Sequence, residues 1–413
     1  MAVQGRTSLR ALLTANAISL TGNKMTLLVI PWFVLETTGS PSRTALAGFF
    51  AFLPIPLSSL LGGPLIDRVG FKRMSIIADL SSATTVAAIP LLHATIGIEF
   101  WQLLVLVFLG ALLDAPGGTA RSSLLPEIAE EAGTTLERAT SLEDAISRAS
   151  GLFGAPVAGV LIGLIGSANV LWVDAGTFIV SAALVMRFVH DRPVSEDEIV
   201  EPSRYLDELR SGLRFIRKNR LLLMVILTVT VTNFLDGAVG SVVMPVYVKE
   251  RFGDAASLGM ILGVWGGGAV LGSLAFGWLG ERFSRRTLFI TGFLAIAVQG
   301  FVLAAFPPLW AILVFMLSAG FLAGPINPIM GTVILERTPK DLRGRVIGAS
   351  IATSWMAIPL GILAGGAMIE AWGLRPTLIA IASLYTATVL TALINPGTKD
   401  LNRTPSEPSV IMD

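Results

Sequence analysis

Long apolar runs, separated by short charged or turn-rich breaks, dominate the pattern of hydrophobic and polar positions along this chain. A helix needs roughly 20 mostly apolar residues to cross a bilayer. Twelve runs reach that length, and they predict spans at 10–36, 44–66, 74–95, 99–120, 140–166, 169–189, 221–248, 256–280, 287–306, 308–332, 345–369 and 374–394. We therefore expect an all-α integral membrane protein with twelve transmembrane helices.

Basic residues gather at one end of these predicted spans. Of 30 Lys and Arg residues, 24 lie in the N-terminal tail, in alternate loops or in the C-terminal tail. Cytoplasmic loops carry an excess of Lys and Arg. This bias places both termini in the cytoplasm, and it supports an even number of spans.

The break at 190–220 divides the chain into two halves of six spans, 1–189 and 221–394. Its acidic beginning is expected to be a solvated linker. After Pro202, an apolar face with Arg210 and Arg214 lying off it predicts a helix at the cytoplasmic membrane surface. The polar segment 395–413 is expected to be a disordered cytoplasmic tail.

Composition narrows the function further. Hydrophobic residues make up 53% of the chain and charged residues 14%, with no cysteine and two histidines. This composition gives no basis for a disulfide, a thiolate nucleophile or a metal site, and a net charge of +1 is not that of a nucleic-acid-binding protein. No segment gathers a nucleophile, a base and an orienting residue. We expect a protein without enzymatic activity or cofactor.

The two halves carry matching segments. Residues 63–73, after the second predicted span, are similar to 277–286, after the eighth, and the spacing that relates them also relates Pro31 to Pro245. A duplicated six-helix unit is the simplest explanation. It predicts two pseudo-symmetric bundles with a central site between them.

These segments resemble motifs of the major facilitator superfamily. The stretch at 63–73 is similar to the superfamily's signature between spans 2 and 3, through Gly63, Asp67, Arg68, Gly70, Lys72 and Arg73, and Glu281 with Arg282 repeats its acidic and basic pair. Span 5 resembles the antiporter motif of drug exporters through Gly151, Gly154, Pro156 and Gly159. The segments 120–127, 174–178 and 343–348 are similar to the macrolide and siderophore exporter branch, which often has Gly-Asp in place of Gly22-Asn23.

The resemblance implies roles for two of these motifs. In the first, Asp67 would engage the cytoplasmic start of span 11 in the outward-facing state and act as a conformational latch; the alternative is that its charges only anchor the topology. In span 5, Pro156 and its glycines would form a seal or hinge specific to exporters. Generic close packing of helices by small residues explains that second pattern equally well.

Ionisable residues inside spans are costly and are therefore functional candidates. They are Lys24, Asp79, Asp114, Asp174 and Asp236. Lys24 and Asp236 occupy nearly equivalent positions of spans 1 and 7, which predicts an ion pair that opens when substrate or a proton arrives; a static pair or two unpaired groups are the alternatives. Asp114 is a further gating candidate, or else a member of a structural network with Asp79. Asp174 is expected near the outer end, within reach of water.

Uncharged side chains inside spans suggest a substrate cavity. The candidates are Asn16, Asn233, Trp265, Gln299, Asn327 and Trp355. An apolar, aromatic site with a few polar groups suits amphiphilic molecules. Together with these residues, the resemblance implies a monomeric exporter of amphiphilic drugs in a bacterial inner membrane, surrounded by membrane lipids. It would work by alternating access in exchange for protons. A siderophore exporter, a lipid flippase and a non-transporting sensor remain alternatives.

Overall fold

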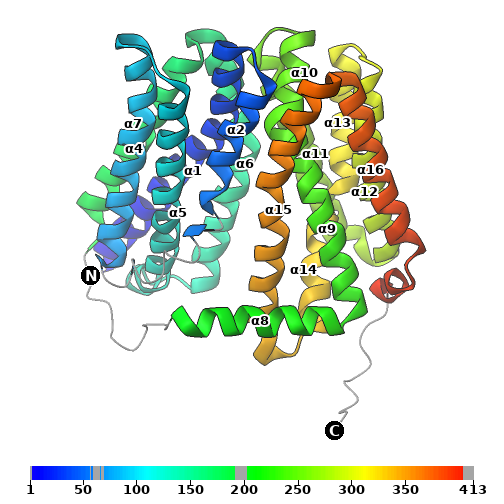
Figure 1. The fold of residues 1–413 in the computed structure, drawn as a ribbon. Helices are drawn as coiled ribbons and strands as arrows, with labels where there is room; N and C mark the ends of the chain where they lie inside the picture. The colour runs from blue at the N-terminus through cyan, green and yellow to red at the C-terminus, as the bar shows by residue number, and fades with distance from the viewer. Residues whose placement is uncertain (1, 56, 59–65, 67–68, 191–201, 403–413) are drawn as a thin grey trace. The chain divides into compact units, whose positions relative to one another are not determined.

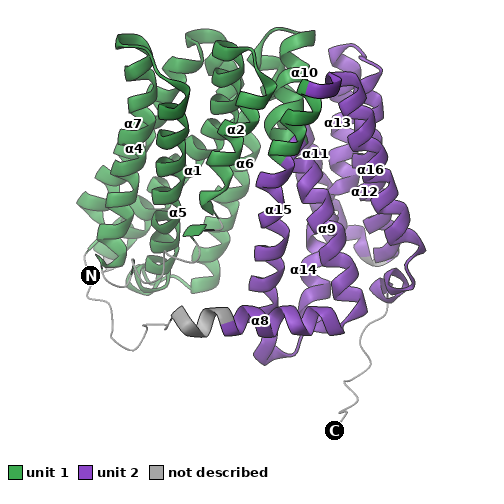
Figure 2. Cartoon of the chain, viewed as in Figure 1, with its two compact units in different colours: residues 1–201, 239–263, 362–370 green, residues 202–238, 264–361, 371–413 purple. Residues whose placement is uncertain are grey.

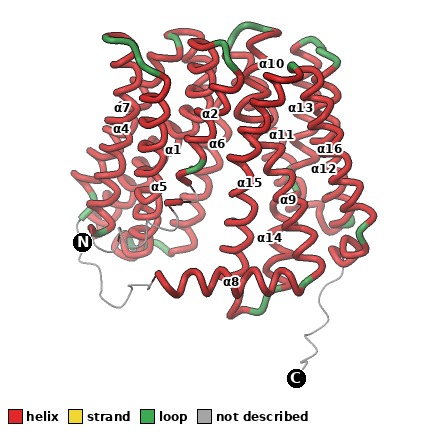
Figure 3. The backbone as a smooth tube through the Cα atoms, viewed as in Figure 1, coloured by secondary structure: helices red, strands yellow, loops and turns green. Residues whose placement is uncertain are grey.

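The computed structural model describes residues 2–55, 57–58, 66, 69–190 and 202–402, and helices with the short loops between them account for all of these (Figures 1 and 3). Within this part of the chain, 11 helical segments are long and apolar enough to cross a membrane. They are α1 (Ala2–Thr38), α4 (Phe71–Thr95), α5 (Phe100–Glu131), α6 (Leu136–Ile165), α7 (Ser167–Phe188), α9 with α10 (Arg220–Arg251), α11 (Ala255–Leu279), α12 (Arg285–Ala304), α13 with α14 (Leu309–Arg337), η4 with α15 (Lys340–Trp372) and α16 (Leu374–Ile394).

These segments confirm eleven of the predicted spans, and the chain is a multi-pass membrane protein. The predicted span 44–66 begins as α2 (Pro41–Phe52), and most of its remainder lies outside the described residues. The largest difference in a boundary is at α5, which continues to Glu131 instead of ending near residue 120. Its last turns are polar on their exposed face, so hydropathy alone does not reveal them.

Two of the spans are interrupted next to a proline. The seventh consists of α9 (Arg220–Ala238), a π-helical turn (Val239–Val243) and α10 (Met244–Arg251), with Pro245 just after the turn. Proline lacks a backbone N–H, and its ring clashes with the carbonyl four residues earlier, so the regular hydrogen bonding cannot continue. The tenth span breaks between α13 (Leu309–Ala323) and α14 (Ile326–Arg337), at Pro325.

The helices form two compact units (Figure 2). Unit 1 comprises residues 1–201, 239–263 and 362–370, and unit 2 comprises 202–238, 264–361 and 371–413. Unit 1 therefore includes segments from both halves of the sequence. The division of the chain into bundles at 1–189 and 221–394 stays a prediction.

Helix α1 is the centre of unit 1. It packs against α2, α5, α6 and α7, while α4 covers α5 and α7. The contact surfaces of α1 are almost completely buried, as at Ala15 with 0% exposure and Val29 with 1%. A helix surrounded in this way cannot change its position without changing its contacts to several neighbours.

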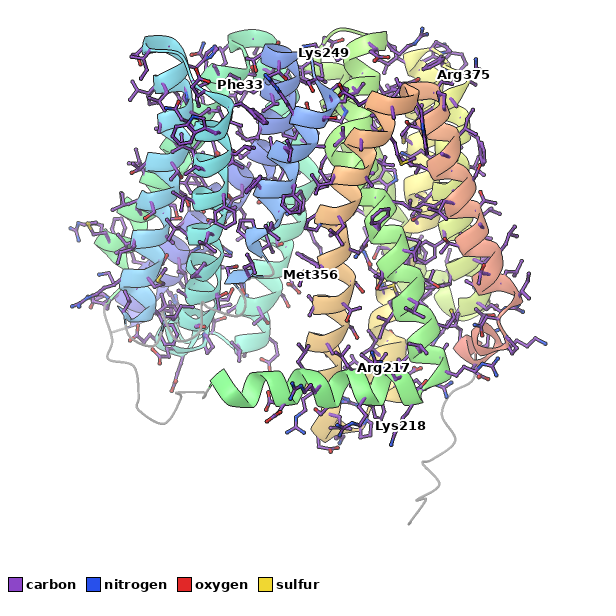
Figure 4. The ribbon with its side chains drawn as sticks, viewed as in Figure 1. Phe33, Arg217, Lys218, Lys249, Met356 and Arg375 are labelled. Carbon is purple, nitrogen blue, oxygen red and sulfur yellow. The ribbon has the colours of Figure 1, made fainter. Side chains whose placement is uncertain are left out.

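In unit 2, α12 packs against α13 and α16, and α16 packs against α9. The amphipathic helix predicted after Pro202 is α8 (Pro202–Lys218), which runs across the ends of α9 and α15 (Figure 1). Its Gly212 is buried where a Cβ would overlap the Arg345 carbonyl. Its basic residues Arg210, Arg214, Arg217 and Lys218 are exposed, and the last two are labelled in Figure 4.

The predicted disorder of the tail is wrong for its first part. Residues Pro396–Asn402 form a 3₁₀ helix, in which Leu401 is 1% exposed. Nη2 of Arg337 donates to the carbonyl oxygen of Asp400 at 2.7 Å, and the Arg286 N–H donates to Oδ1 of Asn402 at 3.1 Å. The polar residues here form hydrogen bonds with the end of α14 and the start of α12. Residues 403–413 lie outside the described part of the chain.

Close contact between α11 and α13 depends on glycines. A Cβ on Gly320 would overlap the Trp265 carbonyl oxygen, and one on Gly268 would overlap that of Leu317. Without a hydrophobic driving force between helices in lipid, such close packing supplies much of the association energy.

We expect Gly320→Val to separate α11 from α13 and to lower the stability of the detergent-purified protein by about 1–3 kcal/mol, the usual cost of overpacking. The measurement is thermal unfolding. Gly331→Val is the matched control, because Gly331 also lies inside a helix but has open space around its Cβ position. Equal effects of the two substitutions would show that helix propensity, and not the contact, accounts for the loss.

Candidate functional site

An ion pair lies in the core of unit 1. Asp79 on α4 is 0% exposed and Arg121 on α5 is 2% exposed, and Nη1 of Arg121 lies 2.9 Å from Oδ1 of Asp79. The Ser181 hydroxyl donates to Oδ2 of Asp79 at 2.6 Å, and Ser19 lies within hydrogen-bond distance of both charged groups. Each oxygen of the Asp79 carboxylate therefore has a donor, and the pair is compensated as a buried charge requires.

Asn16 belongs to the same network. It is 6% exposed, and its amide oxygen accepts a hydrogen bond from Nε of Arg121 at 3.3 Å. The structure thus places Asn16 beside the guanidinium group in the core, and not on an open cavity wall as its polar character within a span suggests.

Asp114 on α5 is only partly satisfied. Nδ2 of Asn23 donates to its Oδ2 at 2.9 Å, but its Oδ1 is buried and has no hydrogen-bond partner among the described residues. The neighbour of Asn23, Lys24, lies where α6 crosses α1, because a Cβ on Gly154 would come within 2.5 Å of the Lys24 Cβ. Asp114 is therefore near the Asp79 network without sharing its hydrogen bonds.

The Asp174 side chain on α7 is more buried than the sequence suggests. The prediction that it is within reach of water is wrong, because the side chain is 1% exposed. Its Oδ2 accepts a hydrogen bond from the Thr26 hydroxyl, and the Thr177 hydroxyl is 3.2 Å from its Oδ1. Depth along a span can be estimated from sequence, whereas the direction in which the side chain points depends on the packing of α1 against α7.

In unit 2, Asp236 on α9 has an exposed side chain. Its carboxylate lies beside the hydroxyl of Tyr385 on α16, a residue that is 2% exposed. No feature of the sequence singles out Tyr385 as a neighbour of Asp236. Lys24 belongs to unit 1, and the ion pair between Lys24 and Asp236 stays a prediction.

The span 5 motif forms a close helix contact at part of its length. A Cβ on Gly159 would lie 2.6 Å from the Ala255 carbonyl oxygen and 3.0 Å from the Gly259 Cα of α11, and Gly263 lies over the Pro156 ring. Two further glycines of α6 lie at four-residue intervals from Gly159, namely Gly151 two intervals before it and Gly163 one interval after it, and both have open space at their Cβ positions. We call the contact of Pro156 and Gly159 with Gly259 and Gly263 the seam between α6 and α11. The seam thus covers a shorter part of α6 than the row of glycines in its sequence.

Other contacts within unit 1 join α1 and α2 to segments far along the chain. Nζ of Lys249 (Figure 4) donates to the Leu35 carbonyl oxygen at 3.2 Å, near the end of α1, and lies 5.9 Å from the Trp32 ring centroid. A Cβ on Gly48 would lie 3.1 Å from Ile362 of α15. These contacts and the seam all connect the first six spans to later ones.

The predicted latch falls mostly outside the described residues, which exclude Gly63, Asp67, Arg68 and the side chain of Glu281. Gly70 directly precedes α4 with φ 88°, a conformation that favours glycine. Lys72 is half-buried, while Arg73 and Arg282 are exposed. The latch stays a prediction.

The remaining cavity candidates are distributed over unit 2. Nδ2 of Asn233 donates to the Ser354 carbonyl oxygen at 3.0 Å and joins α9 to α15. Trp265 and Gln299 are half-buried, and Asn327 and Trp355 are exposed. Their role in a cavity stays a prediction. No group of three or more His, Asp or Glu side chains in the described ranges is placed to hold a metal ion.

Comparison with solved structures shows which known fold this chain has. The nucleoside transporter NupG superposes with a TM-score of 0.77 over 94% of this chain and 98% of that one, at 12% identity. A D-xylose-proton symporter gives a TM-score of 0.72 over 96% and 99%, at 14% identity. The chain therefore has the all-α membrane fold of these transporters.

Sequence comparison identifies the family. The transmembrane secretion effector family matches residues 3–410, and the chain belongs to it. Among its relatives is the multidrug efflux pump Tap of Mycolicibacterium fortuitum, 33% identical over 95% of both chains. The multidrug efflux pump Tap of Mycobacterium tuberculosis (strain ATCC 25618 / H37Rv) is 32% identical over 95% of this chain and 94% of that one.

Removing the cation of the buried pair tests its structural role. Arg121→Met leaves the Asp79 carboxylate uncompensated in the core of unit 1, and we expect a loss of about 3–5 kcal/mol in stability. Arg138→Met is the control, since Arg138 is exposed at the start of α6. Thermal unfolding in detergent measures both. If the two variants unfold at the same temperature, the ion pair contributes nothing to stability.

Proposed function

We propose that this chain exports amphiphilic drugs across the cytoplasmic membrane in exchange for protons. The observation that carries the proposal is its similarity to the multidrug efflux pumps named Tap, which extends over 95% of both chains for the first of them. Similarity over the full length includes all the spans that would form the substrate path. An apolar and aromatic set of candidates, with Trp265 and Trp355, suits amphiphilic substrates.

The proposed mechanism is alternating access, in which the seam between α6 and α11 and the Lys249 contact to α1 act as a seal. The seam joins an early to a late span at backbone distance, and the Lys249 side chain joins a late span to the backbone of α1. Both contacts must separate if the halves of the protein rock apart. The small residues of the seam permit two well-packed arrangements, because they present little side chain to interlock.

Protons are the proposed driving force, with no cofactor or metal ion. Asp114 and Asp236 are candidate carriers, with Lys24 as a candidate gating cation. A proton on Oδ1 of Asp114 would lower the cost of leaving this buried oxygen without a donor. We propose further that the transporter acts as a monomer without enzymatic activity and without nucleic-acid partners.

The proposed orientation has both termini in the cytoplasm, as the distribution of basic residues favours. Helix α8 would then lie at the cytoplasmic surface. It exposes Arg210, Arg214, Arg217 and Lys218, which can attract anionic lipid headgroups.

A drug accumulation assay tests the function. In a bacterial strain lacking its major exporters, expression of this chain is expected to lower intracellular accumulation of macrolides, tetracyclines or cationic dyes severalfold, and a protonophore should restore it. The control is the empty vector. Unchanged accumulation of all three classes would contradict drug export and favour a siderophore or a lipid as substrate.

Substitutions on one helix test the seal. Gly159→Val places two methyl groups against the Ala255 carbonyl and Gly259, so the seam cannot close, and we expect export to fall at least tenfold at equal expression. Gly163→Val, one turn later, meets open space and should retain export. Export rates of fluorescent dye from loaded cells provide the measurement. Retention of activity by Gly159→Val would exclude the seam from the transport cycle.

A further inference from the structure

Asp174 is a buried carboxyl group that the proposed mechanism leaves unused. It lies in the membrane-spanning part of α7 and is 1% exposed. The Thr26 hydroxyl of α1 donates to its Oδ2. The Thr177 hydroxyl is 2.7 Å from the Asp174 carbonyl oxygen and 3.2 Å from Oδ1. Gly22 completes the pocket, because any Cβ there would overlap Oδ1 and the Thr177 hydroxyl.

This pocket holds no compensating cation among the described residues. In the same unit, Asp79 has Arg121 at 2.9 Å. The helices packed against α7 are α1, α4 and α6. Of their ionisable groups, Asp79 is paired, Arg148 is exposed, and Glu36 accepts from the Ser167 hydroxyl at 2.5 Å. Neither Lys24 on α1 nor His93 on α4 forms an ion pair with Asp174 among the described residues. Asp114 on α5 is itself an acid and cannot act as a counter-ion.

An ionised carboxylate in this setting is costly, because two hydroxyl groups replace neither bulk water nor a counter-ion. A proton removes the charge. The pocket can serve both forms, since a threonine hydroxyl donates to a carboxylate and can instead accept from a carboxylic acid. The Thr177 hydroxyl, by donating to the backbone carbonyl, keeps its lone pairs available for an acid O–H.

The pocket is also connected to the moving parts of the proposed mechanism. One turn before Thr26 on α1, Asn23 donates to Asp114 on α5. Near the C-terminal end of α1, the Leu35 carbonyl oxygen accepts a hydrogen bond from Lys249. A shift of α1 on release of the Lys249 contact would therefore change the hydrogen bonds of Asp174 and Asp114 together.

We propose that Asp174 is a proton-binding residue of the transport cycle, protonated before drug binds and ionised afterwards, with Thr26 and Thr177 as its hydrogen-bond partners in both states. The proton leaves the Asp174 carboxyl for solvent when drug binds, and it returns in the next cycle. This inference rests on the proposed function, proton-driven drug export.

The experiment measures proton release from the purified, full-length protein in weakly buffered detergent solution with a pH-indicator dye. The probe is a cationic dye that the wild type exports. The wild type is expected to release protons when the dye is added. Asp174→Asn keeps the shape of the side chain, so it should bind the dye but release at least one proton fewer per molecule bound. Asp144→Asn, the same change at an exposed position on α6, should match the wild type.

A second variant separates proton binding from a structural role. Thr26→Val keeps the acid and removes one hydroxyl donor from the carboxylate, so dye-driven release should persist with its pH midpoint about one unit higher. Infrared difference spectra with and without dye should show the loss of a carboxylic-acid C=O band that is absent in Asp174→Asn.

The outcomes distinguish this inference from the function on which it rests. Proton release by Asp174→Asn equal to that of the wild type, or an unchanged infrared band, overturns the role of Asp174. If Asp174→Asn fails to fold, an unchanged pH midpoint in Thr26→Val overturns it instead. If the wild type itself exports drug without releasing protons, the proton coupling of the proposed function fails, and with it the need for any carrier.

Discussion

The cost of charge inside a membrane determines much of this structure. An ionised side chain in a span needs a counter-ion, several hydrogen bonds or a proton. Unit 1 contains three such carboxyl groups within a few helices, and they differ in what compensates them. Asp79 has Arg121 and serine hydroxyls; Asp114 has one amide donor; Asp174 has two hydroxyls. The compensation decreases from Asp79 to the other two groups. Asp79 is therefore suited to a structural role as a permanent charge, and Asp114 and Asp174 are suited to exchange a proton.

The second constraint also follows from the lipid surroundings. The hydrophobic effect does not drive helices together in lipid, so association depends on close packing of their backbones. The glycines of the α6–α11 seam and of the α11–α13 contact allow this. The two contacts differ in what they join. Gly268 of α11 and Gly320 of α13 both lie in unit 2, whereas the seam joins spans from the two halves of the sequence. A contact of the second kind is the kind that alternating access would break and remake.

The sequence was sufficient to predict the spans, the α8 helix and the fold, because these depend on hydropathy, amphipathic period and repeated motifs. It could not distinguish Gly159 from Gly163, which have the same spacing but face different surroundings. It placed Asp174 within reach of water and Asn16 on a cavity, since neither the rotation of a helix about its axis nor its neighbours can be read from one span. Hydrogen bonds from Arg337 and Arg286 order 396–402 despite a polar composition.

The pairing of Asn23 with Asp114 adds a final step. In the exporter branch that the sequence resembles, an aspartate often occupies the position of Asn23. An amide at that position can donate to Asp114, whereas a second carboxylate would repel it unless one of the two held a proton. An asparagine at this position thus removes one ionisable group beside α1. Asp79 also contacts α1, through Ser19, but it is paired with Arg121. Asp114 and Asp174 are then the acids that contact α1 without an ion pair in the described part of unit 1. These two groups are therefore the candidates that we propose for a proton that moves with α1.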